Sequence, residues 1–359
     1  MLAGGAQLRG AAQTINQRLA EACLEGNLPA IQAGTFSSSK TIEIGTAGVR
    51  KNGAPEKATL ENSFHLGSIA KGFTATLVAR LAESGRLSWD VRPGDVLPEL
   101  KTSIHPDYRT ITIDDLLLWR AGVAPLLDPH AADYQSIPRF SGDPAEQRRN
   151  FALHVLRSAP GYPPRSRTVY SNGSYGIVGA MVEAVTRKSW DQLIVMEVLQ
   201  PLKMQGGFGW PAAKSKSETW GHFETEDGLR PHDPTDSYQF PAWMQPGGDL
   251  YMRLCDYIVF LQENLRGLRG ASTFLKQESF RRLHTAWDGE NARGWGVGDD
   301  KRSSEQAGSA RTFLAMGRIW PDDDRGVAVV CNAGGRRAAK RCTDVAATLA
   351  LNAGSAARR

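Results

Sequence analysis

Two serines in the chain are each followed by a lysine three residues later, in Ser37-x-x-Lys40 and Ser68-x-x-Lys71. This spacing can bring a lysine amine to a serine hydroxyl, which is the arrangement of a nucleophile and its base. So short a motif also arises by chance in a chain of this length. The residues around each copy must therefore show which of the two could be catalytic. Ser37 stands in a polar turn between two expected strands, where serine is an ordinary turn residue.

Ser68 has different surroundings, because it follows Phe64-His65-Leu66-Gly67 and opens a helix expected over residues 68–85. The free N–H groups and the positive dipole end of a helix start stabilise an oxyanion and a deprotonated serine. Lys71 shares the same helical face and, when partly buried, has a lowered pKa that suits a base at neutral pH. The alternative is that Ser68 caps the helix and Lys71 lies at the surface; this segment alone leaves both interpretations open.

A second short motif, Tyr170-Ser171-Asn172, is the single Tyr-x-Asn of the chain and precedes a helix expected over residues 174–186. Residues i and i+2 of an extended segment point the same way, so the phenol and the amide can face one cleft. A phenol beside a lysine ammonium can carry protons, and an amide can hold a substrate carbonyl. In isolation the pair could equally be a packed tyrosine and a turn asparagine. Together with Ser68 and Lys71 it favours a catalytic site.

The elements that must position these residues follow from hydrophobic periodicity and turn residues. The pattern predicts two early strands, a helical middle and three late strands, hence one mixed sheet with a helical lobe inserted between its halves. Residues 205–245 show no sustained period and are expected to form a long loop region. The helices are expected at 6–25, 68–85, 112–119, 146–157, 174–186, 189–198, 250–265 and 336–352, and the strands at 30–36, 41–45, 294–298, 312–320 and 326–332.

The composition bounds the class of protein. The 359 residues are 41% hydrophobic, which is enough for a large core and excludes a disordered chain. No apolar run is long enough to span a membrane. The net charge of +5 lies wholly in residues 336–359, and the rest of the chain is balanced. A basic stretch at one end indicates a solvated helix face and tail, so neither a nucleic-acid nor a membrane partner is expected.

Location and cofactors are predicted from what the chain lacks. The N-terminal segment has no continuous apolar core of a secretory leader, and the four cysteines form no close pair, so a cytoplasmic protein with reduced thiols is expected. The histidines are scattered; His222 with Glu224 and His232 with Asp233 could bind a metal, but solvated loop residues are the favoured interpretation. No G-x-S-x-G elbow, phosphate-binding loop or dinucleotide fingerprint occurs. We expect neither a metal nor an organic cofactor.

The combination of Ser68-x-x-Lys71 and Tyr170-x-Asn172 resembles the serine β-lactamase and penicillin-binding-protein superfamily, and more specifically the class C β-lactamase-like esterases and peptidases. The resemblance runs from about residue 8 to residue 352, with the elements in family order. Further stretches that are similar to the family are Thr112-Ile113-Asp114-Asp115-Leu116-Leu117 before Ala121-Gly122-Val123, Pro201-Leu202-Lys203-Met204, Pro246-Gly247-Gly248-Asp249-Leu250, Gly294-Trp295-Gly296, Gly308-Ser309-Ala310-Arg311-Thr312-Phe313 and Asn332-Ala333-Gly334-Gly335.

The resemblance implies a fold. It is an α/β (α+β) fold with a five-stranded antiparallel sheet, flanked by the N- and C-terminal helices, and an inserted all-helical lobe. Residues 1–66 with 210–359 would form the sheet lobe and residues 67–209 the helical lobe. The two lobes would act as one catalytic unit, with the active site between them.

The resemblance also implies roles for individual residues. Ser68 would be the nucleophile, Lys71 its base and Tyr170 the proton carrier to the leaving group, while Asn172 would contact the substrate. The backbone N–H groups of Ser68 and Ser309 would form the oxyanion hole. Deacylation of the acyl-enzyme by water gives hydrolysis, and deacylation by another nucleophile gives acyl transfer.

The chain departs from the family at its third motif, which is Lys-Thr-Gly in β-lactamases and often His-x-Gly in esterase-like members. Here the aligned residues are Gln306-Ala307-Gly308. A lysine would offer a cation to a substrate carboxylate, whereas Gln306 offers only a neutral amide; Arg311 could supply a cation instead. Substrate contacts are therefore expected at Asn172, Gln306, Gly308 and Arg311. Trp119-Arg120 also replaces the His-Thr that usually precedes the family's turn.

These observations predict a serine hydrolase that cleaves an ester or amide bond of a small, mostly uncharged acyl compound. One alternative is a β-lactamase or D-amino-acid peptidase in which Arg311 replaces the missing lysine, and another is an acyltransferase that uses the same acyl-enzyme. A non-catalytic relative that binds a ligand in the cleft is a third, and a nucleic-acid-binding protein a fourth. The sequence leaves the acyl group, the leaving group and the oligomeric state open.

Overall fold

The computed structural model describes residues 13–127 and 130–356 of the chain. The first helix in this part, α1 (Ile15–Gly26), begins later than the periodicity predicts, and residues 6–12 of the expected helix lie outside the described residues. The start is set by a capping box, in which the Thr14 hydroxyl accepts from the Gln17 N–H at 3.3 Å. The Gln17 amide oxygen in turn accepts from the Thr14 N–H at 2.8 Å.

The main sheet is antiparallel throughout, and in the described residues it has six strands where five were expected. The strand that periodicity missed is β9, whose residues Ser-Glu-Gln-Ala-Gly-Ser are small or polar and include no β-branched residue. Its register against β10, from Ser304 opposite Ile319 to Ser309 opposite Leu314, comes from tertiary pairing. In spatial order the strands are β2 (Thr41–Gly48), β1 (Ala30–Phe36), β11 (Arg325–Cys331), β10 (Leu314–Trp320), β9 (Ser304–Ser309) and β8 (Gly296–Val297).

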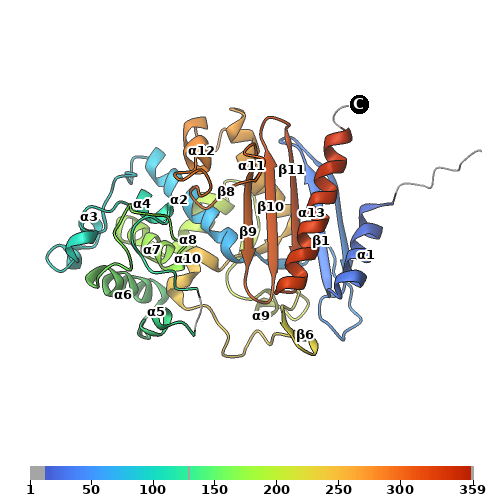
Figure 1. Ribbon diagram of the computed structural model, residues 1–359, viewed down its shortest axis with the longest axis horizontal. Coiled ribbons are helices and arrows are strands. Elements are labelled where there is room, and N and C mark those ends of the chain that lie inside the picture. The colour runs from blue at the N-terminus through green and yellow to red at the C-terminus, as the bar shows by residue number, and fades with distance from the viewer. Residues whose placement is uncertain (1–12, 128–129, 357–359) are drawn as a thin grey trace, which may run out of the picture.

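Helices cover both faces of this sheet. α1 and α13 (Arg336–Ala356) lie in front of it in Figure 1, and α11 (Leu254–Leu268) packs on the opposite face. The two faces are visible in β11, where Val327 and Val329 belong to the cluster under the terminal helices. Ala328 and Val330 belong to the larger core cluster on the other side. The terminal helices therefore flank the sheet.

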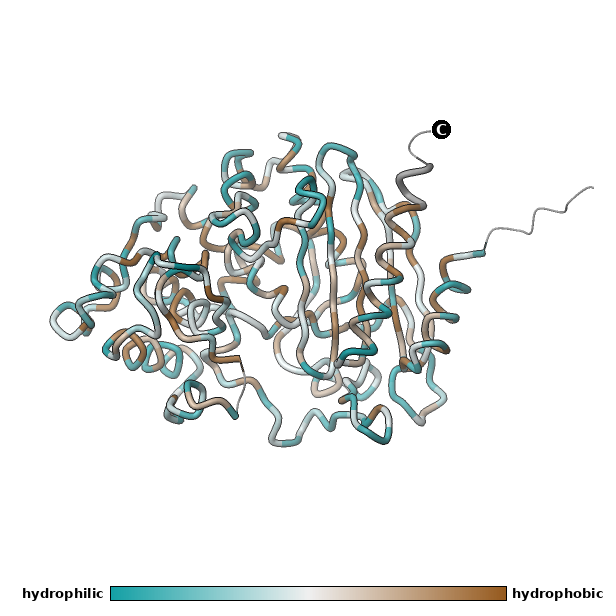
Figure 2. Tube along the Cα trace, viewed as in Figure 1, coloured by the Kyte–Doolittle hydropathy of each residue, from teal (hydrophilic) through white to brown (hydrophobic). Residues whose placement is uncertain are grey.

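The helical lobe lies on the left of Figure 1 and is bound to the sheet by that larger cluster. In Figure 2 the hydrophobic segments gather along the central strands and inside the lobe, while hydrophilic ones follow the outer loops. The lobe contains the five helices expected here, of which three are shorter than the pattern predicts and two begin two residues earlier, and two short helices at residues 93–96 and 132–135 that were not predicted. They are α2 (Ala70–Glu83), α3 (Pro93–Val96), α4 (Ile113–Leu117), α5 (Ala132–Gln135), α6 (Pro144–Arg157), α7 (Asn172–Thr186) and α8 (Trp190–Ile194), followed by a π-helical turn at Val195–Leu199 and interspersed with 3-10 turns at Pro98–Leu100 and Pro106–Tyr108.

Residues 205–245 are mostly irregular, as expected, but contain short elements. The helix expected over 250–265 begins only at Leu254, because the preceding three residues pair as strand β7 with the strand before Ser68. The short elements of this region and of the segments outside the main sheet and the helical lobe are β3 (Ser63–His65), β7 (Tyr251–Arg253) and β4 (Gly206–Gly207) in one small sheet, the hairpin β5 (His222–Thr225) and β6 (Gly228–Pro231), and the helices α9 (Pro211–Lys214), α10 (Gln245–Gly248) and α12 (Gln277–His284), with a 3-10 turn at Ala242–Met244.

Strand β9 and the turn before α2 meet where the helical lobe joins the sheet. This turn is the 3-10 helix η1 (Gly67–Ile69), and it packs directly against the end of β9. The lobe division at residues 66 and 210 stays a prediction, since the larger core cluster runs through both parts. None of the helices in the described part has the length and apolar character needed to cross a membrane.

Candidate active site

Ser68 lies in η1, at the start of the long helix α2. Its hydroxyl caps no helix. Instead it accepts a hydrogen bond from Lys71 Nζ at 3.3 Å and one from the Tyr170 hydroxyl at 2.7 Å. Lys71 is only 1% exposed, so the alternative of a surface lysine is wrong. The structure thus brings the serine, the lysine and the tyrosine together around one oxygen atom.

The Lys71 amine is held by carbonyl oxygens on its other sides. Nζ donates to Asn172 Oδ1 at 2.8 Å and to the Gly247 carbonyl at 2.5 Å. Burial lowers the pKa of Lys71 from its ordinary value of 10.5, and the nearby Tyr170 opposes this in part. A neutral amine has two N–H groups and one lone pair. The ammonium form donates to Ser68, Asn172 and Gly247. In the neutral form the two N–H groups stay with Asn172 and Gly247, so the lone pair faces Ser68 Oγ and can take its proton.

Tyr170 and Asn172 come from the segment that enters α7, and they do face the same lysine. Ser171 between them is extended and caps α7, with its hydroxyl accepting from the Ser174 N–H at 3.2 Å. The helix therefore begins two residues earlier than predicted, at Asn172. The ring of Tyr170 lies 4.7 Å from Lys71 Nζ and is backed by the ring of Trp119, also at 4.7 Å between centroids.

Two glycines let β9 approach Ser68 closely. Gly67 has a φ of +54°, and a Cβ at this position would lie 2.6 Å from the carbonyl carbon of Ser309. A Cβ at Gly308 would overlap the Leu66 carbonyl and lie 3.0 Å from the Ser68 nitrogen. The backbones of Ser68 and Ser309 are therefore neighbours, which is the placement that an oxyanion hole needs.

Sequence reasoning missed a buried pair behind this turn. His65 Nδ1 accepts from the Gly67 N–H at 3.0 Å, and its Nε2–H donates to Asp249 Oδ1 at 3.2 Å. Asp249 also accepts from the Gly209 N–H at 2.6 Å. The available signal was the position of His65 two residues before Gly67, but nothing in the sequence connects it to Asp249.

Gln306 is buried, and its amide is held by the protein. Nε2 donates to the Gly294 carbonyl at 2.9 Å, and Oε1 accepts from the Tyr257 hydroxyl at 3.4 Å. The side chain packs against Gly72 on α2, where a Cβ would overlap it. Its role as a substrate contact stays a prediction.

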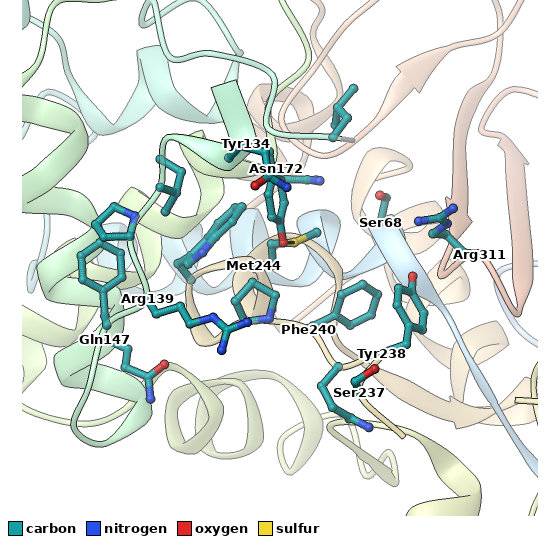
Figure 3. A pocket seen from close by; sticks show the side chains of 18 of the residues that line it. Ser68, Tyr134, Arg139, Gln147, Asn172, Ser237, Tyr238, Phe240, Met244 and Arg311 are labelled. Carbon is teal, nitrogen blue, oxygen red and sulfur yellow. Dashed lines mark hydrogen bonds between the residues drawn. The ribbon is translucent and has the colours of Figure 1, made fainter. Parts of the chain in front are cut away.

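Arg311 is exposed and follows the end of β9. Its backbone has a φ of +61°, and its N–H donates to Ser309 Oγ at 3.1 Å. Its guanidinium lies 5.8 Å from the centroid of the Tyr238 ring. Figure 3 shows this side chain beside Ser68 at one end of the cleft.

Two cavities open at Ser68 and Tyr170. The smaller, of about 170 Å³, also contacts Lys71, Trp119 and Gln306. The larger, of about 800 Å³, is rich in aromatic side chains. Its lining comprises Ser68, Leu127, Tyr134, Gln135, Ile137, Pro138, Arg139, Phe140, Gln147, Tyr170, Asn172, Ser237, Tyr238, Gln239, Phe240, Pro241, Trp243, Met244, Ser309 and Arg311.

The histidines weighed as metal ligands have other partners. The ring nitrogens of His222 lie 2.6 Å from the Asn332 carbonyl and 2.9 Å from the Asn52 N–H, and His232 Nε2 contacts Asp236 at 3.0 Å. Within the described residues, no group of three histidine, cysteine or acidic side chains is arranged to hold a metal ion.

Comparison with known proteins finds a matching family model and relatives that cover most of the chain. The sequence model of the Beta-lactamase family matches residues 11–351. Penicillin-binding protein 4 of Amycolatopsis lactamdurans is 27% identical over 283 residues, which cover 76% of this chain and 71% of that protein. Protein flp of Staphylococcus aureus (strain MW2) is 24% identical over 286 residues, covering 77% of this chain and 54% of flp. The chain thus spans about half the length of flp.

Solved structures share the fold at lower identity. The octameric penicillin-binding protein homologue from Pyrococcus abyssi has a TM-score of 0.76 at 22% identity, covering 94% of this chain and 76% of that one. A class C beta lactamase from Rhodobacter sphaeroides has a TM-score of 0.69 at 21% identity, covering 92% and 97% of the two chains. At these identities the likeness shows the fold alone.

Proposed function

The chain belongs to the beta-lactamase family, and on that premise we propose that it is a serine hydrolase that cleaves an ester or amide bond of a small acyl compound. The reaction would pass through a covalent acyl-enzyme on Ser68. The observation that carries the proposal is the position of Ser68 Oγ, 3.3 Å from the buried amine of Lys71 and 2.7 Å from the Tyr170 hydroxyl.

The steps follow from this geometry. The neutral Lys71 amine takes the proton of Ser68 as Oγ attacks the substrate carbonyl carbon. The oxyanion that forms faces the backbone N–H groups of Ser68 and Ser309. The proton then passes from Lys71 through Tyr170 to the leaving group, whose bond to the carbonyl carbon breaks. Water, activated by the same groups, cleaves the ester to Ser68; an alcohol or amine in its place gives acyl transfer.

The test is covalent labelling by a fluorophosphonate probe together with turnover of short-chain 4-nitrophenyl esters. The second Ser-x-x-Lys sequence provides a matched control, because Ser37 lies in a turn and its hydroxyl contacts Ser39 and the Lys40 carbonyl. We expect Ser68→Ala to lose labelling and turnover, and Ser37→Ala to keep both. Labelling that persists in Ser68→Ala, or a wild-type protein that neither labels nor hydrolyses any ester or amide, would contradict the proposal.

Arg311 favours a second candidate function, a β-lactamase or D-amino-acid peptidase. This side chain lines the larger cavity together with Ser68 and Ser309, so it can offer a cation to a carboxylate close to the nucleophile. A solved D-alanine carboxypeptidase from Burkholderia cenocepacia has the same fold, with a TM-score of 0.71 at 18% identity. Nitrocefin turnover that Arg311→Ala removes would support this function. No turnover and no acyl-enzyme by mass spectrometry would remove it.

A further inference from the structure

The larger cavity has an uneven charge. Among the described residues that line it, Arg139 and Arg311 are the charged ones, and both are cationic. The remaining lining is aromatic, aliphatic or neutral and polar. A cleft with charges of one sign and apolar walls concentrates ligands of the opposite sign.

Neither guanidinium is neutralised by a carboxylate within 4 Å in the part of the chain that the structure describes. Two acidic residues that directly precede lining residues in the chain have other partners. Asp133 accepts from the N–H groups of Leu126 and Tyr134 at 3.0 and 2.9 Å. Asp236 accepts from the Tyr238 N–H at 2.7 Å and contacts His232. Among the described residues, the two guanidinium groups thus have no carboxylate partner and can face a ligand.

The two arginines lie at different distances from the nucleophile. In Figure 3 Arg311 stands beside Ser68, whereas Arg139 extends into the opposite half of the cleft, beyond Met244 and Phe240. Phe240 and Met244 give the stretch between Ser68 and Arg139 an apolar wall, and Trp243 also lines this cavity. A ligand that reaches from Ser68 to Arg139 therefore needs an apolar middle.

The small cavity indicates which part of the substrate occupies the large one. Lys71 lines the cavity of about 170 Å³ and is absent from the lining of the larger cavity. Tyr170, which passes this proton to the leaving group, lines both cavities, so we assign the leaving group to the side on which Lys71 lies, the small cavity. The acyl group then occupies the larger cleft.

We propose that the acyl group of the substrate ends in a carboxylate, and that Arg139 binds this carboxylate at the end of the cleft remote from Ser68. The planar guanidinium can donate two parallel hydrogen bonds to a carboxylate. The aliphatic part of the acyl chain packs between Phe240, Trp243 and Met244. This inference rests on the proposed function, and it names the substrate class as esters or amides of dicarboxylic acids.

The experiment compares pairs of 4-nitrophenyl esters that differ only at the far end of the acyl chain. Adipic, suberic and sebacic monoesters are matched with hexanoic, octanoic and decanoic esters. The readout is the ratio of the two kcat/KM values within a pair, which cancels any general loss of activity. We expect the wild-type protein to favour the carboxylate member about five- to tenfold at one chain length, less at high salt.

Arg139→Gln is expected to bring this ratio to about one, and Arg139→Glu to below one. Arg157→Gln is the matched control, because Arg157 is an exposed arginine of the same lobe that donates to Ser103 and does not line the cleft. This control is expected to keep the wild-type ratio.

Two results would overturn the inference and leave the proposed function standing, provided that neutral esters are hydrolysed through Ser68. One is a wild-type ratio near one at every chain length. The other is a preference that survives Arg139→Gln but is lost in Arg311→Gln, which would place the charge recognition beside the nucleophile. If no ester is hydrolysed and Ser68 is not labelled, the proposed function fails and the inference falls with it.

Discussion

His65 and Asp249 form a buried pair directly behind the turn that carries Ser68. The imidazole Nε2–H donates to the carboxylate at 3.2 Å, which leaves Nδ1 free to accept the Gly67 N–H at 3.0 Å. Aromatic rings enclose the histidine, with Trp210 at 5.0 Å and Phe240 at 5.6 Å between centroids. Asp249 therefore fixes the tautomer of His65, and His65 fixes the backbone next to the Ser68 N–H.

Substitution of His65 tests whether this acceptor holds the oxyanion turn. His65→Ala leaves the buried Gly67 N–H without a partner, at a cost of about 1–3 kcal/mol, so we expect kcat to fall about ten- to hundredfold. His65→Asn places an amide oxygen near the position of Nδ1 and is expected to recover most of the loss. His65→Gln reaches Asp249 but not Gly67 and is expected not to recover it. The measurement is kcat and KM for one ester, with thermal unfolding of each variant.

This role would be contradicted if the three His65 variants had equal kcat values, or if their kcat values simply followed their thermal stabilities. The loss would then reflect general destabilisation of the buried pair rather than the orientation of one N–H group.

Removal of the Tyr170 hydroxyl separates proton transfer from packing. Tyr170→Phe keeps the ring that packs on Trp119 at 4.7 Å but removes the donor to Ser68 Oγ. We expect kcat to fall by about 10²–10⁴, the range for loss of a positioned proton carrier, while the free energy of unfolding changes little. Steady-state kinetics and urea unfolding check this. A variant with wild-type kcat would show that Lys71 delivers the proton without Tyr170.

Local patterns in the sequence singled out Ser68 with Lys71 and Tyr170 with Asn172, because each pair lies at a spacing that one helix or one extended segment imposes, and the resemblance to a family joined the two motifs. The flanking helices and the hairpin of β10 and β11 were predicted for the same reason. Strand β9 was missed since its residues have no strand propensity and its position depends on pairing with β10. Asp249 was missed as a partner of His65 because 184 residues separate them, and only the pairing of β3 with β7 brings them together.

The lowered pKa of Lys71 predicts the pH dependence of the reaction. Burial disfavours the ammonium, so the amine loses its proton below the ordinary value of 10.5. Because the neutral amine is the base, kcat/KM is expected to rise with pH through this lowered pKa and then level off. Lys71→Arg keeps a permanent charge and is expected to lose both the activity and the rise. A rise centred at or above 10.5 would contradict the assignment.

The same shift has a consequence for stability. Between the lowered pKa and 10.5 the unfolded chain binds the Lys71 proton and the folded protein does not, so this group makes stability rise with pH in that window. Urea unfolding across the window is expected to show a smaller rise in Lys71→Met than in the wild-type protein. An identical slope in the two proteins would contradict the shift.

The close approach of β9 to Ser68 predicts that Gly308 tolerates no side chain. A Cβ there would meet backbone atoms of Leu66, Ser68 and Ile69, which cannot move aside as a flexible side chain would. Gly308→Ala is expected to cost about 1–3 kcal/mol of stability and, by displacing Ser68 and Ser309, to lower kcat at least about tenfold.

Gly94→Ala is the matched control, because a Cβ at Gly94 in α3 would have no atom within 4 Å. We expect it to retain the wild-type kcat and to change stability by less than about 1 kcal/mol. If Gly308→Ala matched this control in kcat, the oxyanion hole would not depend on the contact between β9 and η1.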